Sequence, residues 1–144
     1  MRCKQKILAL LLAVALLLAM SSTALADGNV CKIGEKEYAS LAEAVAAVPT
    51  NGTQTTITLL KDTTGNGVVV EKGKNIIFDL GGNAYTVDGT VGSSGTETNG
   101  FQLLKGSTVT FKNGTINAGK AKILIQNYAD LTLKDVTLDA QGTG

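Results

Sequence analysis

The chain has 144 residues, a formal net charge of +1 at pH 7, and neither histidine nor tryptophan. Only 17 % of its residues are charged, whereas phosphate recognition needs a clustered basic surface. We therefore expect no nucleic-acid partner.

The first 26 residues have the pattern of a secretory signal peptide. Arg2, Lys4 and Lys6 precede an apolar run over 7–20, and a small-residue segment ends in Ala-Leu-Ala at 24–26. The run is shorter than the ~20 residues that a membrane-spanning helix needs. We expect bacterial-type export, cleavage after this segment, and a secreted or cell-surface protein with no membrane segment. An uncleaved anchor is the alternative.

Residues 27–144 are long enough for one domain with a modest core. Without the leader, ten lysines and no arginine remain against twelve acidic residues, so the net charge becomes −2. Cys31 is then the only thiol. We predict a buried apolar role for it, with an intermolecular disulfide as the alternative.

One helix is expected from Ser40 to Val48. Glu43 follows Ser40 by three residues, the spacing of a capping box, and Leu41, Val45 and Val48 recur at helical spacing. Proline at 49 and the following Asn-Gly turn end the helix.

From residue 55 onward, short strings alternate apolar and polar residues, as strands do. Apolar residues recur 22 positions apart, as from Val109 to Leu131, and a polar glycine-rich insertion occupies 90–99. A unit of this size cannot bury its apolar face alone, but stacked units share a core. The predicted inward columns are Val70, Leu103 and Ile125; Ile76, Val109 and Leu131; and Phe78, Phe111 and Leu133.

Other columns of the same repeat are predicted to be structural. Asp79, Lys112 and Lys134 share an outward column that could hold an exposed Asp–Lys pair. Asn113 and Asp135 fall together at a turn.

The helix segment YASLAEAVAAV, then TITLLKD, then IIFDLGGNAYTV, resemble bacterial secreted proteins of the pectin-lyase-like superfamily. Gly81 stands where that family usually has asparagine. The resemblance implies an all-β fold: a right-handed parallel β-helix, or solenoid, with coils of about 22 residues, as in the repeat, and a short N-terminal capping α-helix. An N-terminal strand and the capping helix would occupy 27–54, and the coils 55–144. The last coil carries no cap, so we expect a truncated chain.

The resemblance also bears on chemistry. Lyases, hydrolases and esterases of the superfamily use arginine, paired aspartates or aspartate-bound calcium. No catalytic residue of the family maps onto this chain, so we expect no catalysis and no cofactor. Asp130, Asp135 and Asp139 give a weak hint of calcium, which needs six to eight oxygen ligands.

These observations favour a secreted or cell-surface module that acts in adhesion, in glycan contact or as a spacer. Its partner would be an extracellular polysaccharide or a host or cell surface. The candidate contact residues are Tyr128, Thr96, Glu97 and Asn99, because an exposed ring and the inserted loop suit recognition. The alternative is the N-terminal fragment of a polysaccharide lyase or hydrolase whose catalytic coils are missing. A third hypothesis is end-to-end self-association through the uncapped last coil.

Overall fold

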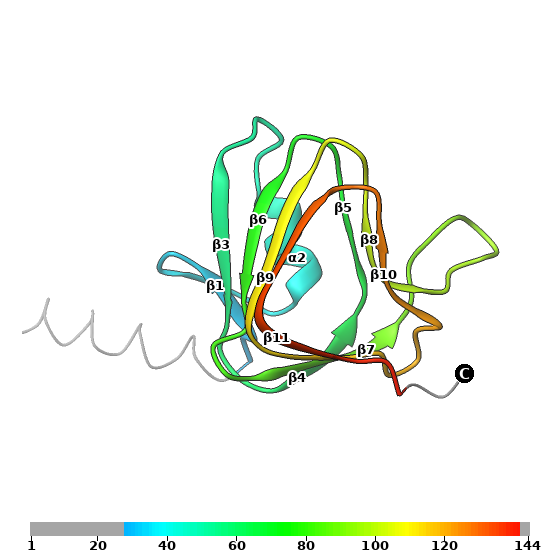
Figure 1. Ribbon diagram of the computed structural model, residues 1–144. Coiled ribbons are helices and arrows are strands. Elements are labelled where there is room, and N and C mark those ends of the chain that lie inside the picture. The colour runs from blue at the N-terminus through cyan, green and yellow to red at the C-terminus, as the bar shows by residue number, and fades with distance from the viewer. Residues whose placement is uncertain (1–27, 142–144) are drawn as a thin grey trace, which may run out of the picture.

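The computed structural model describes residues 28–141, in which strands dominate and one short helix occurs (Figure 1). The predicted signal peptide lies outside these residues. In chain order the elements are β1 (Cys31–Ile33), β2 (Lys36–Tyr38), α2 (Leu41–Ala47), β3 (Gln54–Leu59), β4 (Thr63–Asn66), β5 (Val68–Val70), β6 (Asn75–Asp79), β7 (Ala84–Gly89), β8 (Asn99–Leu103), β9 (Thr108–Asn117), β10 (Ile123–Asn127) and β11 (Asp130–Asp139).

The strands form two sheets. The larger has eight strands in the order β2-β1-β3-β6-β9-β7-β4, with β11 paired to β9, and the smaller is β10-β8-β5. Figure 1 shows β3, β6, β9 and β11 side by side on the left, the smaller sheet on the right, and α2 behind the strands. The larger sheet is curled, which places the apolar faces of both sheets toward one interior.

The predicted regular parallel β-helix solenoid is wrong. The larger sheet is mixed, because β1 pairs antiparallel with both β2 and β3. It also curls without a break into a half-barrel: β9 is ten residues long and pairs with β6 through its first half and with β7 through its second. The repeat predicted two strands with a turn at Asn113, but the backbone there takes a positive φ of 60° and bends while pairing continues.

The predicted pairing register is confirmed along this larger sheet. Val109 lies opposite both Ile76 and Leu131, and Phe111 opposite both Phe78 and Leu133. These neighbours are parallel, as 22-residue spacing requires for stacked strands. Asp135 has a φ of 50° and matches Asn113 in position, so the predicted alignment of these two residues is confirmed, but each lies at a bend inside a strand and not at a turn between strands.

One predicted column is wrong. Val70 does pair with Leu103, but Leu103 pairs next with Asn127, and Ile125 lies opposite Phe101. The connection between β10 and β11 contains residues 128–129, whereas the one between β8 and β9 contains 104–107. This shorter turn shifts β10 by two residues against the 22-residue repeat.

The helix follows the prediction closely. It runs from Leu41 to Ala47, and the Ser40 hydroxyl accepts a hydrogen bond from the Glu43 backbone amide at 3.2 Å. Leu41, Val45 and Val48 are all buried, so the predicted apolar stripe is confirmed. At seven residues the helix is too short to persist alone, and the packing of its buried face against β1, β2, β4 and β5 holds it.

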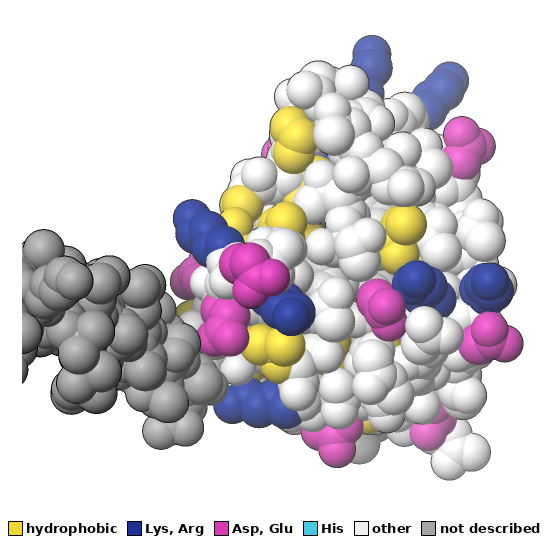
Figure 2. Space-filling view, turned by 90° about the vertical axis from the view of Figure 1, so that its left-hand side faces the viewer, with side chains coloured by type: hydrophobic (Ala, Val, Ile, Leu, Met, Phe, Trp, Pro, Cys, Tyr) yellow, Lys and Arg dark blue, Asp and Glu magenta, His cyan; other side chains and the backbone are white. Residues whose placement is uncertain are grey.

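The predicted outward ion pair is also confirmed. Lys112 Nζ lies 3.6 Å from Asp79 Oδ2, and the other carboxylate oxygen accepts from the backbone amide of Gly81 at 3.0 Å. Both side chains are partly exposed, so the pair adds little stability. On the face drawn in Figure 2, lysines and acidic side chains are interspersed without a single-sign area.

Cys31 is fully buried at the start of the fold, as predicted, and its Sγ lies 3.6 Å from the carbonyl oxygen of Ser40. Burial raises the pKa of the Cys31 thiol from 9.0 to about 11, and the carboxylate of Glu43 adds to the rise. The thiol is therefore protonated and inert at neutral pH.

This pKa predicts a pH dependence of stability. Between pH 9 and about 11 the unfolded chain loses the Cys31 proton while the folded chain keeps it. The contribution is therefore fully present below pH 9 and is lost as the pH rises through that window, with a slope of up to ~1.4 kcal/mol per pH unit. Urea unfolding between pH 8 and 11, compared with the Cys31→Ala variant, measures it. Parallel curves for the two proteins would contradict the prediction.

Candidate functional site

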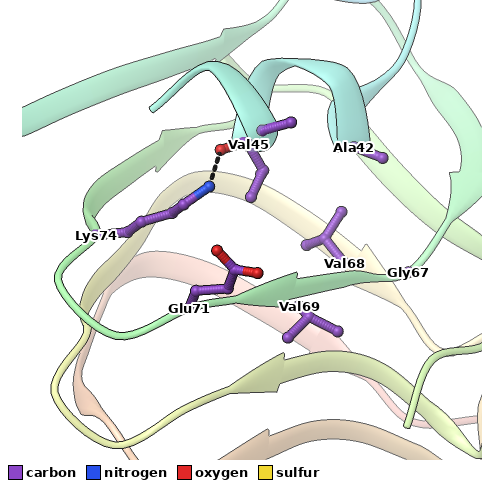
Figure 3. Close-up of a pocket in the computed structure, with 8 residues that line it drawn as sticks. Ala42, Val45, Gly67, Val68, Val69, Glu71 and Lys74 are labelled. Atoms are coloured by element: carbon purple, nitrogen blue, oxygen red, sulfur yellow. Dashed lines mark hydrogen bonds between the residues drawn. The ribbon is translucent and has the colours of Figure 1, made fainter. Parts of the chain in front are cut away.

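One hollow in the described part of the chain lies between α2 and β5. It has a volume of about 300 Å³ and is lined by Ala42, Val45, Ala46, Gly67, Val68, Val69, Glu71 and Lys74. Figure 3 shows Lys74 reaching up to the helix, where its Nζ donates to the carbonyl oxygen of Val45 at 2.7 Å. Lys74 is buried and satisfies a carbonyl in the last turn of α2. We interpret this hollow as structural.

Another hollow is a polar groove between the connection at 90–98 and the smaller sheet. Its volume is about 280 Å³, and it is lined by Ser93, Thr96, Thr98, Asn99, Gln102, Gln126 and Tyr128. Each lining side chain has a hydroxyl or an amide and none is charged. The described residues therefore place seven uncharged polar side chains around one surface depression.

The wall formed by the connection is ordered by its own hydrogen bonds. Val91 and Asn99 form an antiparallel bridge, with N–H to O distances of 2.8 and 2.9 Å in the two directions. The backbone amide of Thr96 donates to the carbonyl oxygen of Ser93 at 2.9 Å. Figure 1 shows this connection projecting from the curled body beside β10. It thus presents its hydroxyl groups from a fixed position.

The floor of the groove is a cluster of three amides. Gln126 Oε1 accepts from Asn99 Nδ2 at 3.0 Å and from Gln102 Nε2 at 2.9 Å. Gln102 and Gln126 are adjacent because β8 and β10 pair in parallel with these two residues opposite each other. Among residues 28–141, neither Gln126 Nε2 nor Gln102 Oε1 makes a hydrogen bond. The floor therefore offers a free donor and a free acceptor.

Tyr128 stands at one end of this amide cluster. It follows β10 in the short turn, and its backbone amide donates to the carbonyl oxygen of Leu103 at 2.8 Å, which anchors the turn. Its side chain is 61 % exposed, the most exposed large apolar side chain of the described region. A ring held at the edge of a polar groove is suited to stack on the flat face of a ligand.

Three of the four residues predicted from sequence meet in this groove: Tyr128, Thr96 and Asn99. Glu97 does not line it. Its carboxylate accepts from the backbone amide of Gly95 at 3.1 Å, and its carbonyl oxygen accepts from the Thr90 hydroxyl at 2.7 Å. Glu97 therefore supports the loop.

Sequence reasoning missed four lining residues: Ser93, Thr98, Gln102 and Gln126. A 22-residue repeat pairs Gln102 with Leu124, whereas the shortened turn before β11 brings Gln126 beside it. Each of the two strands contains a glutamine, in GFQLL and in KILIQ, and this was the signal available in the sequence. Only the observed register shows that the two glutamines are neighbours.

Acidic and sulfur-containing side chains do not assemble a second site in the part of the chain that the structure describes. No three or more His, Cys, Asp or Glu residues in that part gather closely enough to hold a metal ion. Asp130, Asp135 and Asp139, the source of the calcium hint, are spread along β11. Nor does any described helix have the length and hydropathy required to cross a membrane.

Comparison of the chain with protein-family models, with curated proteins and with solved structures finds no match. The resemblance to the pectin-lyase-like superfamily thus stays a prediction from short motifs, and the groove must be interpreted from its own chemistry.

Proposed function

We propose that this protein is an exported binding module that contacts a neutral carbohydrate through the polar groove. One observation carries the proposal: an exposed tyrosine ring borders a cluster of amides that keeps a free donor and a free acceptor. Sugar hydroxyls both donate and accept, so amides match them in either direction, and the ring covers the apolar face of a pyranose. The signal peptide predicted over 1–26 would deliver the module outside the cell.

The absence of charge from the groove lining narrows the ligand class. A uronate polysaccharide carries a carboxylate on each sugar, and its recognition calls for lysine or arginine. The seven lining residues supply neither. We therefore expect neutral hexose or N-acetylhexosamine polymers to bind and polygalacturonate not to bind.

The ring and the amides give the first test. Replacing the ring in Tyr128→Ala should weaken binding of a neutral oligosaccharide roughly tenfold, because the stacking contact is lost. Tyr128→Phe keeps the ring and should bind nearly as wild type. Gln102→Ala removes a free acceptor and should weaken binding several-fold. A glycan array identifies the ligand, and isothermal titration calorimetry measures the four proteins.

Glu97→Gln is the matched control, because Glu97 belongs to the same loop but lies outside the groove lining, and glutamine keeps the Oε1 acceptor. Its affinity should equal that of the wild type. Equal binding by Tyr128→Ala and wild type, or selective binding of polygalacturonate, would refute the neutral-carbohydrate proposal.

A further inference from the structure

The outer edge of β11 is a second surface of interest, separate from the polar groove. Within residues 28–141, β11 pairs with β9 alone, so its second edge has no strand beside it. Leu133 is 46 % exposed and Leu138 is 38 % exposed, yet their register partners Phe111 and Ile116 are buried. The columns of core side chains thus continue onto β11, where their last members are exposed to solvent. A long unpaired edge with apolar side chains is a template for another strand.

The backbone groups at this edge are placed for pairing. The amide of Asp130 donates inward, to the carbonyl oxygen of Ser107 at 3.2 Å. Because backbone groups alternate in direction along a strand, Thr132 and Lys134 also face β9, and Leu131 and Leu133 turn their amides and carbonyls to the free edge.

The segment from Asp130 to Lys134 is complementary to itself when reversed. In an antiparallel pair centred on Thr132, Leu131 lies opposite Leu133 and Asp130 lies opposite Lys134. The opposed leucines are the residues whose backbone groups face outward, so they can exchange hydrogen bonds. The opposed charges are of opposite sign, which favours the pair. Charge, side-chain face and backbone direction all agree on one register.

We propose that two copies of this chain associate through β11, antiparallel about a two-fold axis at Thr132, so that the larger sheet continues from one copy into the other. An isologous contact of this kind is self-limiting and yields a dimer. Each copy would cover the exposed Leu133 of the other. The opposite end of the sheet is a poorer partner, because β2 is only three residues long and contains Lys36 and Glu37.

A charge-swap series tests the register. Lys134→Glu places two acidic side chains opposite each other and should weaken dimerisation roughly tenfold or more. Within one copy, this change sets a carboxylate beside Lys112, so folding should not suffer. Asp130→Lys should weaken the dimer likewise, and the double variant Asp130→Lys/Lys134→Glu should restore it. Sedimentation velocity over a concentration series measures the dimer, and thermal unfolding confirms that each variant is folded.

A cysteine on the proposed axis tests the same geometry directly. Cys3 is replaced by serine to remove a competing thiol, and Cys31 can stay because it is buried. In this Cys3→Ser background, Thr132→Cys should form a disulfide-linked dimer on mild oxidation, since the two copies of residue 132 face each other. Thr137→Cys, which is also exposed on the same strand but lies away from the axis, should not. A wild-type protein that stays monomeric at millimolar concentration, or a double variant that fails to restore the dimer lost by both single variants, would overturn the proposal.

Discussion

Phe111→Ala is expected to lower the free energy of unfolding by ~3–5 kcal/mol, the usual cost of removing a buried aromatic ring. Phe111 is 1 % exposed. Its ring stacks on that of Phe78 at 4.9 Å between centroids and meets the edge of Phe101 at 5.0 Å. Phe78 and Phe111 come from the larger sheet and Phe101 from the smaller, so the cluster joins the two sheets. Loss of Phe111 leaves a cavity where they meet.

Leu133→Ala is the matched control for this prediction. Leu133 is the register partner of Phe111 and faces the same way, but it lies on the edge strand and is 46 % exposed. Its truncation should cost below ~1 kcal/mol. Urea unfolding at a concentration where the protein is monomeric measures both variants. Similar losses in the two variants would mean that the sheets do not meet at Phe111.

Gly119→Ala is expected to cost about 3 kcal/mol or more, for two reasons that add. Gly119 lies between β9 and β10 with a φ of +55°, where a side chain is strained. A Cβ at Gly119 would also stand 2.0 Å from the carbonyl oxygen of Val87. That oxygen cannot move freely, because it accepts a hydrogen bond from the backbone amide of Lys120 at 2.9 Å.

Gly34→Ala measures the backbone strain of a positive φ without a steric clash of the added Cβ. Gly34 has a nearly identical φ of +57°, but nothing lies within 4 Å of the Cβ position. Its replacement should cost only the backbone strain, ~1–2 kcal/mol. Thermal or urea unfolding of the two variants side by side gives the difference. Equal destabilisation would show that the approach of Val87 to this turn is looser than described.

Local patterns predicted much of this molecule because they depend on a few neighbouring residues. The cap at Ser40 and the stripe through Val45 arise within one helix. The alternation along Val109 and Phe111 decides which side chains face inward, since successive residues of a strand point to opposite faces. The ion pair of Asp79 with Lys112 follows from spacing by the same logic. Tyr128 was predicted to be exposed because it stands in a turn.

The candidate site was predictable only in part. Tyr128, Thr96 and Asn99 came from the inserted loop and a turn, where recognition residues concentrate. The amide cluster on the groove floor could not be predicted in this way, because it depends on Gln102 and Gln126 being neighbours. That adjacency results from a connection two residues shorter than the equivalent one earlier in the chain, and a fixed repeat length cannot anticipate it.

The sequence by itself determined the helix, the inward face of the strands that carry Val70, Ile76, Phe78, Leu103, Val109 and Phe111, and most of the parallel register, because all three follow from side-chain periodicity. The tertiary structure alone decided that β1 pairs antiparallel, that β9 and β11 each run on through a bend at Asn113 or Asp135, and that the result is a curled mixed sheet with a smaller sheet opposite. Periodicity specifies which face of a strand is buried, whereas the direction and continuity of pairing depend on contacts between distant segments.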